Sequence, residues 1–114
     1  MKRFVTAAGT AALLFGSVAL FAQNKVGDAK AGDAKKGEET FEQCKVCHNA
    51  DSTEKKMGPG LKGLFQHEKM ANGKKPSEEN VLAKINEGGN GMPAYNEMLS
   101  ADEKTDLIAY LKTL

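Results

Sequence analysis

The sequence predicts a single all-α domain made of a few short helices. Its 114 residues are the length of one domain. No segment alternates apolar and polar residues with the period of two that marks a half-buried strand, whereas several stretches place a capping residue before apolar residues spaced three and four apart. The net charge of +1 gives no strong electrostatic field, which argues against nucleic acid or an anionic membrane as a partner.

Residues 1–22 are predicted to be a signal peptide. Lys2 and Arg3 give the segment a positive start, the rest of it carries no charge, and small residues close it. Cleavage is expected after Ala19 or Ala22. The alternative is an uncleaved membrane anchor, but threonine, serine and glycine residues dilute the hydrophobicity of the segment and favour cleavage. The exported protein is expected to be periplasmic or secreted.

The polar residues 23–32 are predicted to be a flexible lead-in, because they hold too few apolar side chains to pack. Residues 33–114 form the predicted domain. Asp33 is the expected N-cap of its first helix, which runs toward Cys44. Gly37 in this helix costs up to about 1 kcal/mol relative to alanine. We therefore expect either that another helix presses close to Gly37 or that the first turn frays.

The middle of the domain is predicted to hold turns, a loop and a second helix. Glycine and proline make 49–60 a turn region, followed by a short helical piece from 61 to about 66 and a solvated loop over 67–76. Ser77 is expected to cap the second helix, with glutamates in its first turn, and Gly88 to end it. The apolar stripe of this helix consists of Val81, Leu82 and Ile85.

The C-terminal part of the domain is predicted to be an extended segment and a last helix. Residues 90–95 are expected to be extended, because the residue before Pro93 is pushed out of the α region. Ser100 and Glu103 form the predicted capping box of the helix over 100–114. The buried face of this helix consists of Leu107, Ile108, Leu111 and Leu114, with Tyr110 beside them.

The stretch Cys44-Lys45-Val46-Cys47-His48 is the attachment pattern of a c-type haem. On the last turn of a helix, residues three and four apart share one face, so the two thiols and the imidazole would point the same way. The thiols can then add to the two vinyl groups of a porphyrin, and His48 can reach the iron as its proximal ligand. A large apolar disc would also complete the core of a small domain that contains no tryptophan.

Met92 is the predicted second ligand of the iron. It lies in a rigid Gly-Met-Pro setting with no helix to join, far enough along the chain from His48 to reach the other side of a haem. Methionine ligation gives a higher reduction potential than a second histidine would. The other candidates are Met57 in a turn, Met98, which is expected to pack beside Leu99, and Met70 and His67, which are expected to be exposed among charged residues.

The order of the motifs resembles that of the small class I cytochromes c. The motifs are the Cys-His pattern, Gly58-Pro59-Gly60-Leu61, Gly91-Met92-Pro93-Ala94-Tyr95 and the amphipathic last helix. The resemblance covers residues 33–114. It implies a cytochrome c-like fold in which three to five helices wrap around one covalently bound haem c, with the first and last helices crossing near a right angle.

The resemblance also implies individual contacts around the haem. The carbonyl of Pro59 would accept a hydrogen bond from the ring of His48, which fixes the ring and raises its basicity, and Leu61 would pack on the haem face. At the helix crossing, the contact would be made by Gly37, Phe41, Leu107 and Tyr110. No arginine remains for the propionates once the leader is removed, and the candidates are Tyr95, Asn90 and nearby lysines.

The function implied by the resemblance is that of a soluble one-electron carrier and not of an enzyme. We expect a monomer that meets redox proteins transiently and, once the leader is cut, has no stable contact with a membrane. Exposed lysines could frame the docking rim, namely Lys45, Lys55, Lys56, Lys62, Lys69, Lys74 and Lys75.

The alternative is the electron-accepting haem c subunit of a periplasmic oxidoreductase complex. A permanent subunit should expose a large apolar patch, and the polar character of the expected surface favours the shuttle. An open-site haem enzyme or sensor would require that Met92 does not bind. Among non-haem alternatives, a thioredoxin-like site needs a βαβ setting, structural zinc needs four ligands, and a Cys44–Cys47 disulfide leaves His48 and Met92 unexplained.

Overall fold

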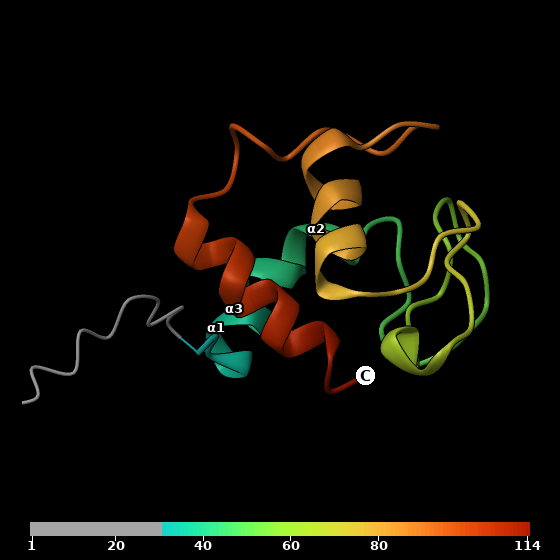
Figure 1. The fold of residues 1–114 in the computed structure, drawn as a ribbon, viewed down its shortest axis with the longest axis horizontal. Helices are drawn as coiled ribbons and strands as arrows, with labels where there is room; N and C mark the ends of the chain where they lie inside the picture. The colour runs from blue at the N-terminus through green and yellow to red at the C-terminus, as the bar shows by residue number, and fades with distance from the viewer. Residues whose placement is uncertain (1–30) are drawn as a thin grey trace, which may run out of the picture.

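The computed structural model describes residues 31–114, so the predicted signal peptide and most of the predicted lead-in lie outside the described residues. The described part contains α1 (Ala34–Phe41), the 3-10 turns η1 (Glu42–Cys44) and η2 (Leu64–Gln66), α2 (Glu78–Glu87) and α3 (Ala101–Leu111) (Figure 1). Between residues 31 and 114 there is no strand beyond one isolated bridge. The all-α prediction is confirmed. No helix in this range is long and apolar enough to cross a membrane.

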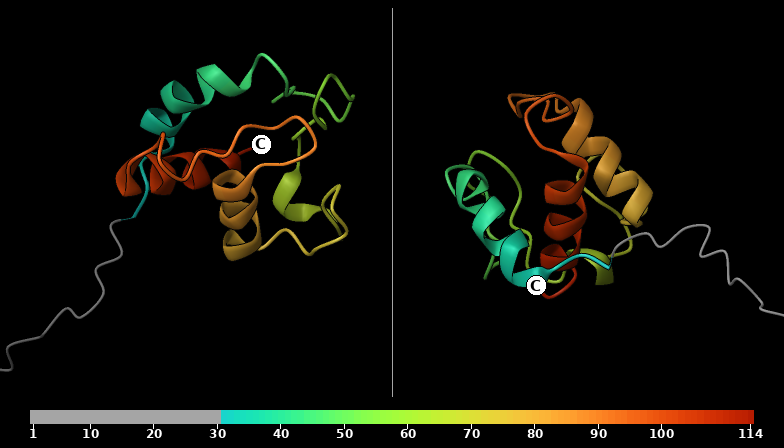
Figure 2. Two further views of the ribbon diagram at one scale, coloured as in Figure 1. Left: turned by 90° about the horizontal axis from the view of Figure 1, so that it is seen from above. Right: turned by 90° about the vertical axis from the view of Figure 1, so that its left-hand side faces the viewer.

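Helices α1 and α3 cross in direct contact, although α1 is the first helix in the sequence of the domain and α3 is the last (Figure 2). A Cβ added to Gly37 of α1 would lie 1.9 Å from the carbonyl oxygen of Asp106 and 2.8 Å from the Cβ of Tyr110 in α3. One turn further along, the rings of Phe41 and Tyr110 lie 5.2 Å apart and tilted. Glycine is therefore required at 37 because a helix presses against it, and the fraying alternative is wrong.

The N-terminus of α1 is fastened to α3 by a buried carboxylate. As predicted, the Asp33 side chain caps α1 by accepting hydrogen bonds from the N–H groups of Lys35 and Lys36. The backbone N–H of Asp33 in turn donates to Asp106 Oδ1 over 2.7 Å. Asp106 is only 5% exposed. A charged group buried to this degree needs a hydrogen-bond partner, and this one finds its partner on the other helix.

The starts of α2 and α3 are capped as the sequence predicts. Ser77 Oγ accepts from the N–H of Asn80, and both halves of the Ser100–Glu103 capping box are present. An ion pair between Lys112, just after α3, and Glu78, at the start of α2, joins the two helices. Each charge lies at the helix end whose dipole favours it.

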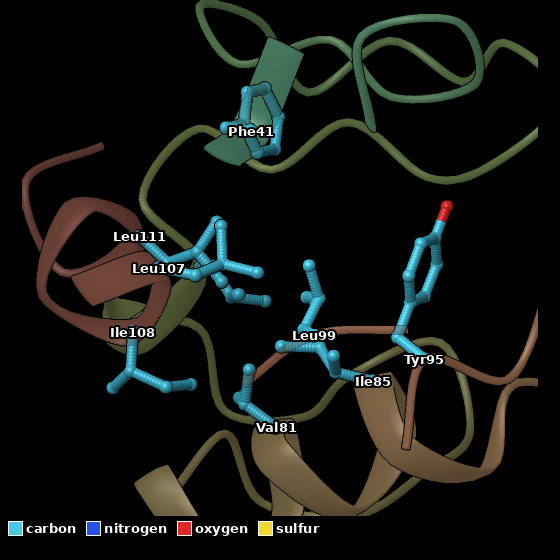
Figure 3. Close-up of a cluster of buried hydrophobic side chains, with 9 residues drawn as sticks. Phe41, Val81, Ile85, Tyr95, Leu99, Leu107, Ile108 and Leu111 are labelled. Carbon is cyan, nitrogen blue, oxygen red and sulfur yellow. The ribbon is translucent and has the colours of Figure 1, made fainter. Parts of the chain in front are cut away.

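The hydrophobic core lies where α1, α2 and α3 meet the segment that precedes α3 (Figure 3). Its buried residues are Phe41, Leu64, Val81, Ile85, Tyr95, Leu99, Leu107, Ile108 and Leu111. Half-buried apolar side chains pack against this cluster, among them Leu61, Phe65, Leu82 and Met92. The predicted stripes of α2 and α3 are thus confirmed as core-facing.

The prediction that residues 90–95 are extended is wrong for its first half. Asn90 and Gly91 both have positive φ angles, +54° and +91°. The N–H of Gly89 donates to the carbonyl of Met92 over 2.9 Å, and the reverse bond measures 3.1 Å. These angles and bonds are those of a type I′ turn, for which Asn-Gly is the favoured dipeptide. The chain therefore reverses just before Met92.

Candidate haem-binding site

The Cys-His motif continues the helical path of α1 through η1. The N–H of His48 donates to the carbonyl of Cys44 over 2.9 Å, which is the spacing of an α-helical bond, and the N–H of Cys47 donates to the same carbonyl over 3.1 Å. The two thiols and the imidazole therefore come from one helical turn, in which residues three and four apart share a face. Both cysteines are free thiols and half-buried.

The imidazole of His48 has a fixed tautomer. Its Nδ1 lies 2.8 Å from the carbonyl oxygen of Pro59, and a carbonyl can only accept. Nδ1 therefore carries the hydrogen, and Nε2 keeps its lone pair for a metal. This is the contact that the resemblance implied. A carbonyl behind a ligating imidazole also orients the ring and raises its basicity.

The ring of His48 rests against Gly58. A Cβ at this position would lie 2.5 Å from Cε1 and 2.8 Å from Nδ1 of the ring. The N–H of Gly58 donates to the carbonyl of Cys47 over 2.8 Å, which holds the glycine in place. The sequence placed Gly58 in a turn and in the Gly58-Pro59-Gly60-Leu61 motif, but did not predict its contact with the His48 ring. The signal that could have identified it is its place immediately before the proline that holds the histidine.

A return loop over residues 49–61 folds back onto the attachment turn. The N–H of Leu61 donates to the carbonyl of Asn49 over 2.7 Å, closing the base of the loop. Lys56 Nζ donates to the carbonyl of Lys45 over 3.0 Å, inside the Cys-His motif itself. Together with the Gly58 and Pro59 contacts, these bonds hold the His48 side of the site in place through contacts within the protein alone.

The two sulfur atoms have different surroundings. Burial, and secondarily the nearby Cys47, raise the pKa of Cys44 to about 11, so its thiol stays protonated at neutral pH. Cys47 Sγ lies 3.9 Å from the sulfur of Met57, whose side chain is 78% exposed. A protonated thiol carries the hydrogen that addition to a vinyl group requires.

The candidate second ligands lie in different environments. Met92 is half-buried against the core and follows the type I′ turn, while Gly88 lies so close that a Cβ there would be 2.4 Å from the Met92 carbonyl. Met98 is exposed, so the expectation that it packs is wrong, because the core at this point is filled by the next residue. Met70 is half-buried against the core and not exposed as expected. His67 is exposed as expected.

These residues fit a covalently attached haem. Two thiols lie on one helical turn beside an imidazole whose Nε2 is free and whose ring is held between a carbonyl and a glycine. Leu61 and Met92 contribute half-buried apolar side chains at the edge of the core. Thioether-forming thiols, an imidazole nitrogen and a methionine sulfur are the donors that such a haem uses.

Comparisons with known proteins agree with this chemistry. Residues 32–111 match the family model described as cytochrome C oxidase, cbb3-type, subunit III. Cytochrome c2 of Blastochloris viridis is 46% identical over 54 residues, a match that covers 46% of this chain and 41% of the relative. The match thus spans less than half the length of that relative. Because the family model covers most of the chain, the protein belongs to this family of c-type cytochromes and carries a covalently bound haem c.

Proposed function

We propose that this haem c electron carrier holds its iron between Nε2 of His48 and the sulfur of Met92. The observation that carries the proposal is the hydrogen bond from His48 Nδ1 to Pro59, because it leaves Nε2 as the free ligand atom. Met92 is supported by its half-buried position and by the tight turn that holds it. When bound, the haem supplies an iron that accepts and releases one electron.

The remaining site residues would attach the haem, orient the His48 ring and cover the haem face. The Cys44 and Cys47 thiols would hold the haem through thioether bonds, each S–H adding across one vinyl double bond so that sulfur bonds to one carbon and hydrogen to the other. Pro59 and Gly58 orient the His48 ring, and Leu61, half-buried against the core, would pack on the haem face. With His48 and Met92 as ligands, no iron position would remain for a substrate, so the proposed role is that of a carrier and not of an enzyme.

We further propose that residues 1–22 direct export and are removed, which would place the domain over 33–114 in the periplasm or outside the cell. The support is the positive start and uncharged length of the leader. Covalent attachment of haem to two free thiols also suits a chain that is exported before its haem is added.

The proposed partners are redox proteins that dock transiently. All seven lysines of the predicted rim are exposed. Lys45 and Lys56 lie directly at the attachment turn, where Val46 and Met57 are also exposed. A small apolar spot among lysines suits brief contact with an acidic surface.

The second candidate is a haem c subunit within an oxidoreductase complex. The observation in its favour is the description of the matching family model, which names a subunit of an oxidase. Within residues 31–114 the large apolar side chains with high exposure are Val46, Met57 and Met98. Gel filtration and cross-linking in extracts of the native host separate the two candidates: a carrier elutes as a monomer, whereas a subunit stays with its complex.

The ligand proposal is tested by absorption spectroscopy of the holoprotein made with its leader in a host that attaches haem. Methionine sulfur on ferric iron gives a weak near-infrared band, which we expect in the parent and in Met98→Ala, the exposed control, but not in Met92→Ala. A parent without this band whose ferrous form binds carbon monoxide readily would contradict the proposal and point to an open site.

A further inference from the structure

The chain passes from α2 into the type I′ turn over residues 89–92 through two glycines. Gly88 follows the last residue of α2 and Gly89 begins the turn, and their φ angles are +62° and +109°. Figure 1 shows the chain leaving the end of α2, reversing and returning across the same helix end. Glycine has the widest choice of backbone conformations, so a pair of glycines keeps one direction only where neighbours hold it. The direction in which the chain leaves α2 toward Met92 therefore depends on the contacts of this pair.

Both backbone polar groups of Gly88 are bonded to Lys84, one turn earlier in α2. The N–H of Gly88 donates to the carbonyl of Lys84 over 2.8 Å. The carbonyl of Gly88 accepts from Lys84 Nζ over 2.9 Å, in a part-buried hydrogen bond. A lysine in this position also suits the negative end of the helix dipole. Lys84 thus holds the residue that ends the helix through its backbone and through its side chain.

The peptide unit between Gly88 and Gly89 connects Lys84 to Met92. A peptide unit is planar, and in the trans form its C=O and N–H point in opposite directions. The Gly88 carbonyl at one end of the unit accepts from the ammonium group of Lys84. The Gly89 N–H at the other end donates to the carbonyl of Met92 over 2.9 Å. One rigid plane bonded at both ends therefore fixes the backbone of Met92 relative to the ammonium group.

We propose that Lys84 is a positioning residue which, through this peptide unit, keeps Met92 at the iron and so excludes competing ligands. The inference rests on the proposed function, because it takes Met92 as the second ligand. The bond that Lys84 donates is charge-assisted and therefore among the stronger hydrogen bonds. Without the ammonium group the two glycines regain conformational freedom. The state in which the Met92 sulfur has left the iron then becomes more populated, and a competing ligand binds more tightly in proportion.

The test measures imidazole binding to the ferric holoproteins of the parent, Lys84→Leu and Lys104→Leu. Leucine removes the ammonium group, keeps a high helix propensity and brings no new sulfur. Lys104 is a matched control, because it is also half-buried and its Nζ also donates to a backbone carbonyl over 2.9 Å, that of Asn96, outside the 89–92 turn. We expect Lys84→Leu to bind imidazole about threefold more tightly than the parent, or tighter still, and Lys104→Leu to bind it like the parent.

The conservative variant Lys84→Arg separates the hydrogen bond from a general effect of the substitution. Its guanidinium group can still donate to the Gly88 carbonyl, so it should bind imidazole more weakly than Lys84→Leu. Equal affinities in the parent and Lys84→Leu overturn the inference. Equal increases in Lys84→Leu and Lys104→Leu overturn it as well, and so do equal affinities in the arginine and leucine variants.

A second measurement reports the turn itself, whichever group binds the iron. Amide hydrogen exchange of the ferrous holoproteins, followed by NMR, should be faster at Gly89 and Met92 in Lys84→Leu than in the parent or Lys104→Leu, because these two N–H groups close the turn. Unchanged exchange at both amides overturns the inference. A parent without the near-infrared band, in which Lys84→Leu still speeds this exchange, would defeat the His48/Met92 proposal while leaving the contact between Lys84 and the turn intact, so the two failures are distinguishable.

Discussion

At the scale of single residues, the site depends on Gly58 and Pro59, which have no reactive side chain but contact the ring of His48. Gly58 has no side chain, and the His48 ring occupies the place where a Cβ would lie. Pro59 contributes a carbonyl, which any residue could supply, at the place where it decides the tautomer of His48. The sequence predicted Cys44, Cys47 and His48 as the attachment residues, because their spacing places them on one face of a helical turn. It could not identify Gly58, whose importance appears only when the loop folds back.

Gly58→Ala should move the ring of His48. The added methyl would sit 2.5 Å from Cε1 of His48, so either the ring or the return loop must shift. We expect a loss of about 1–3 kcal/mol in stability, as for other overpacked sites, together with a changed ferric haem spectrum.

The control for this variant is Gly73→Ala. Gly73 has a φ of +82° and no atom within 4 Å of an added Cβ, so the substitution costs only backbone strain, about 1–2 kcal/mol. Thermal unfolding and absorption spectra of both holoproteins measure the loss of stability and the change in the haem spectrum. Equal spectra for the two variants would mean that the ring does not need the space at 58.

At the scale of elements, helix starts were predictable and turns and burial were less so. Asp33, Ser77 and Ser100 cap as expected because a cap is made by residues within three positions of each other. The reversal at Asn90 was missed because the effect of the following proline was given more weight than the Asn-Gly signal. The burial of Met70 and the exposure of Met98 were misjudged because only the packed core decides which apolar side chains it takes in.

Asp106→Ala should loosen the joint between α1 and α3. The substitution removes the buried acceptor of a part-buried hydrogen bond that the N–H of Asp33 donates, which costs about 1–3 kcal/mol. Asp106→Asn is the matched variant, because its amide oxygen can still accept, and it should lose less. Thermal unfolding of the holoproteins measures both. If alanine and asparagine cost the same, the carboxylate contributes through its charge and not through this hydrogen bond.

At the scale of the whole molecule, the ordered set of motifs predicted both the family and the helical architecture. No single motif would have been enough, since five-residue patterns arise by chance. The order in which they occur suits a chain that closes its first helix on its last. Surface properties were predictable only as charge, because seven exposed lysines indicate the type of partner and not its identity.

Electron transfer to an acidic redox partner should slow as salt is added. Raising the ionic strength shortens the range over which the lysine rim attracts the partner, so the second-order rate measured by stopped flow should fall. Lys55→Glu, in the return loop next to Lys56, should lower the rate at low salt more than Lys36→Glu on α1. A rate that does not depend on salt, or equal effects of the two variants, would remove the lysine rim from the docking step.

The joint between Asp33 and Asp106 also has a consequence for the order of folding. That contact spans 73 residues, whereas the contacts of the return loop, such as His48 with Pro59, span 11. By the logarithmic growth of loop entropy, closing the longer loop costs about 1.7 kcal/mol more, and distant contacts form more slowly than local ones. We therefore expect the cysteine turn and its return loop to form first and the two ends of the domain to meet last, which leaves both thiols accessible while haem is being attached.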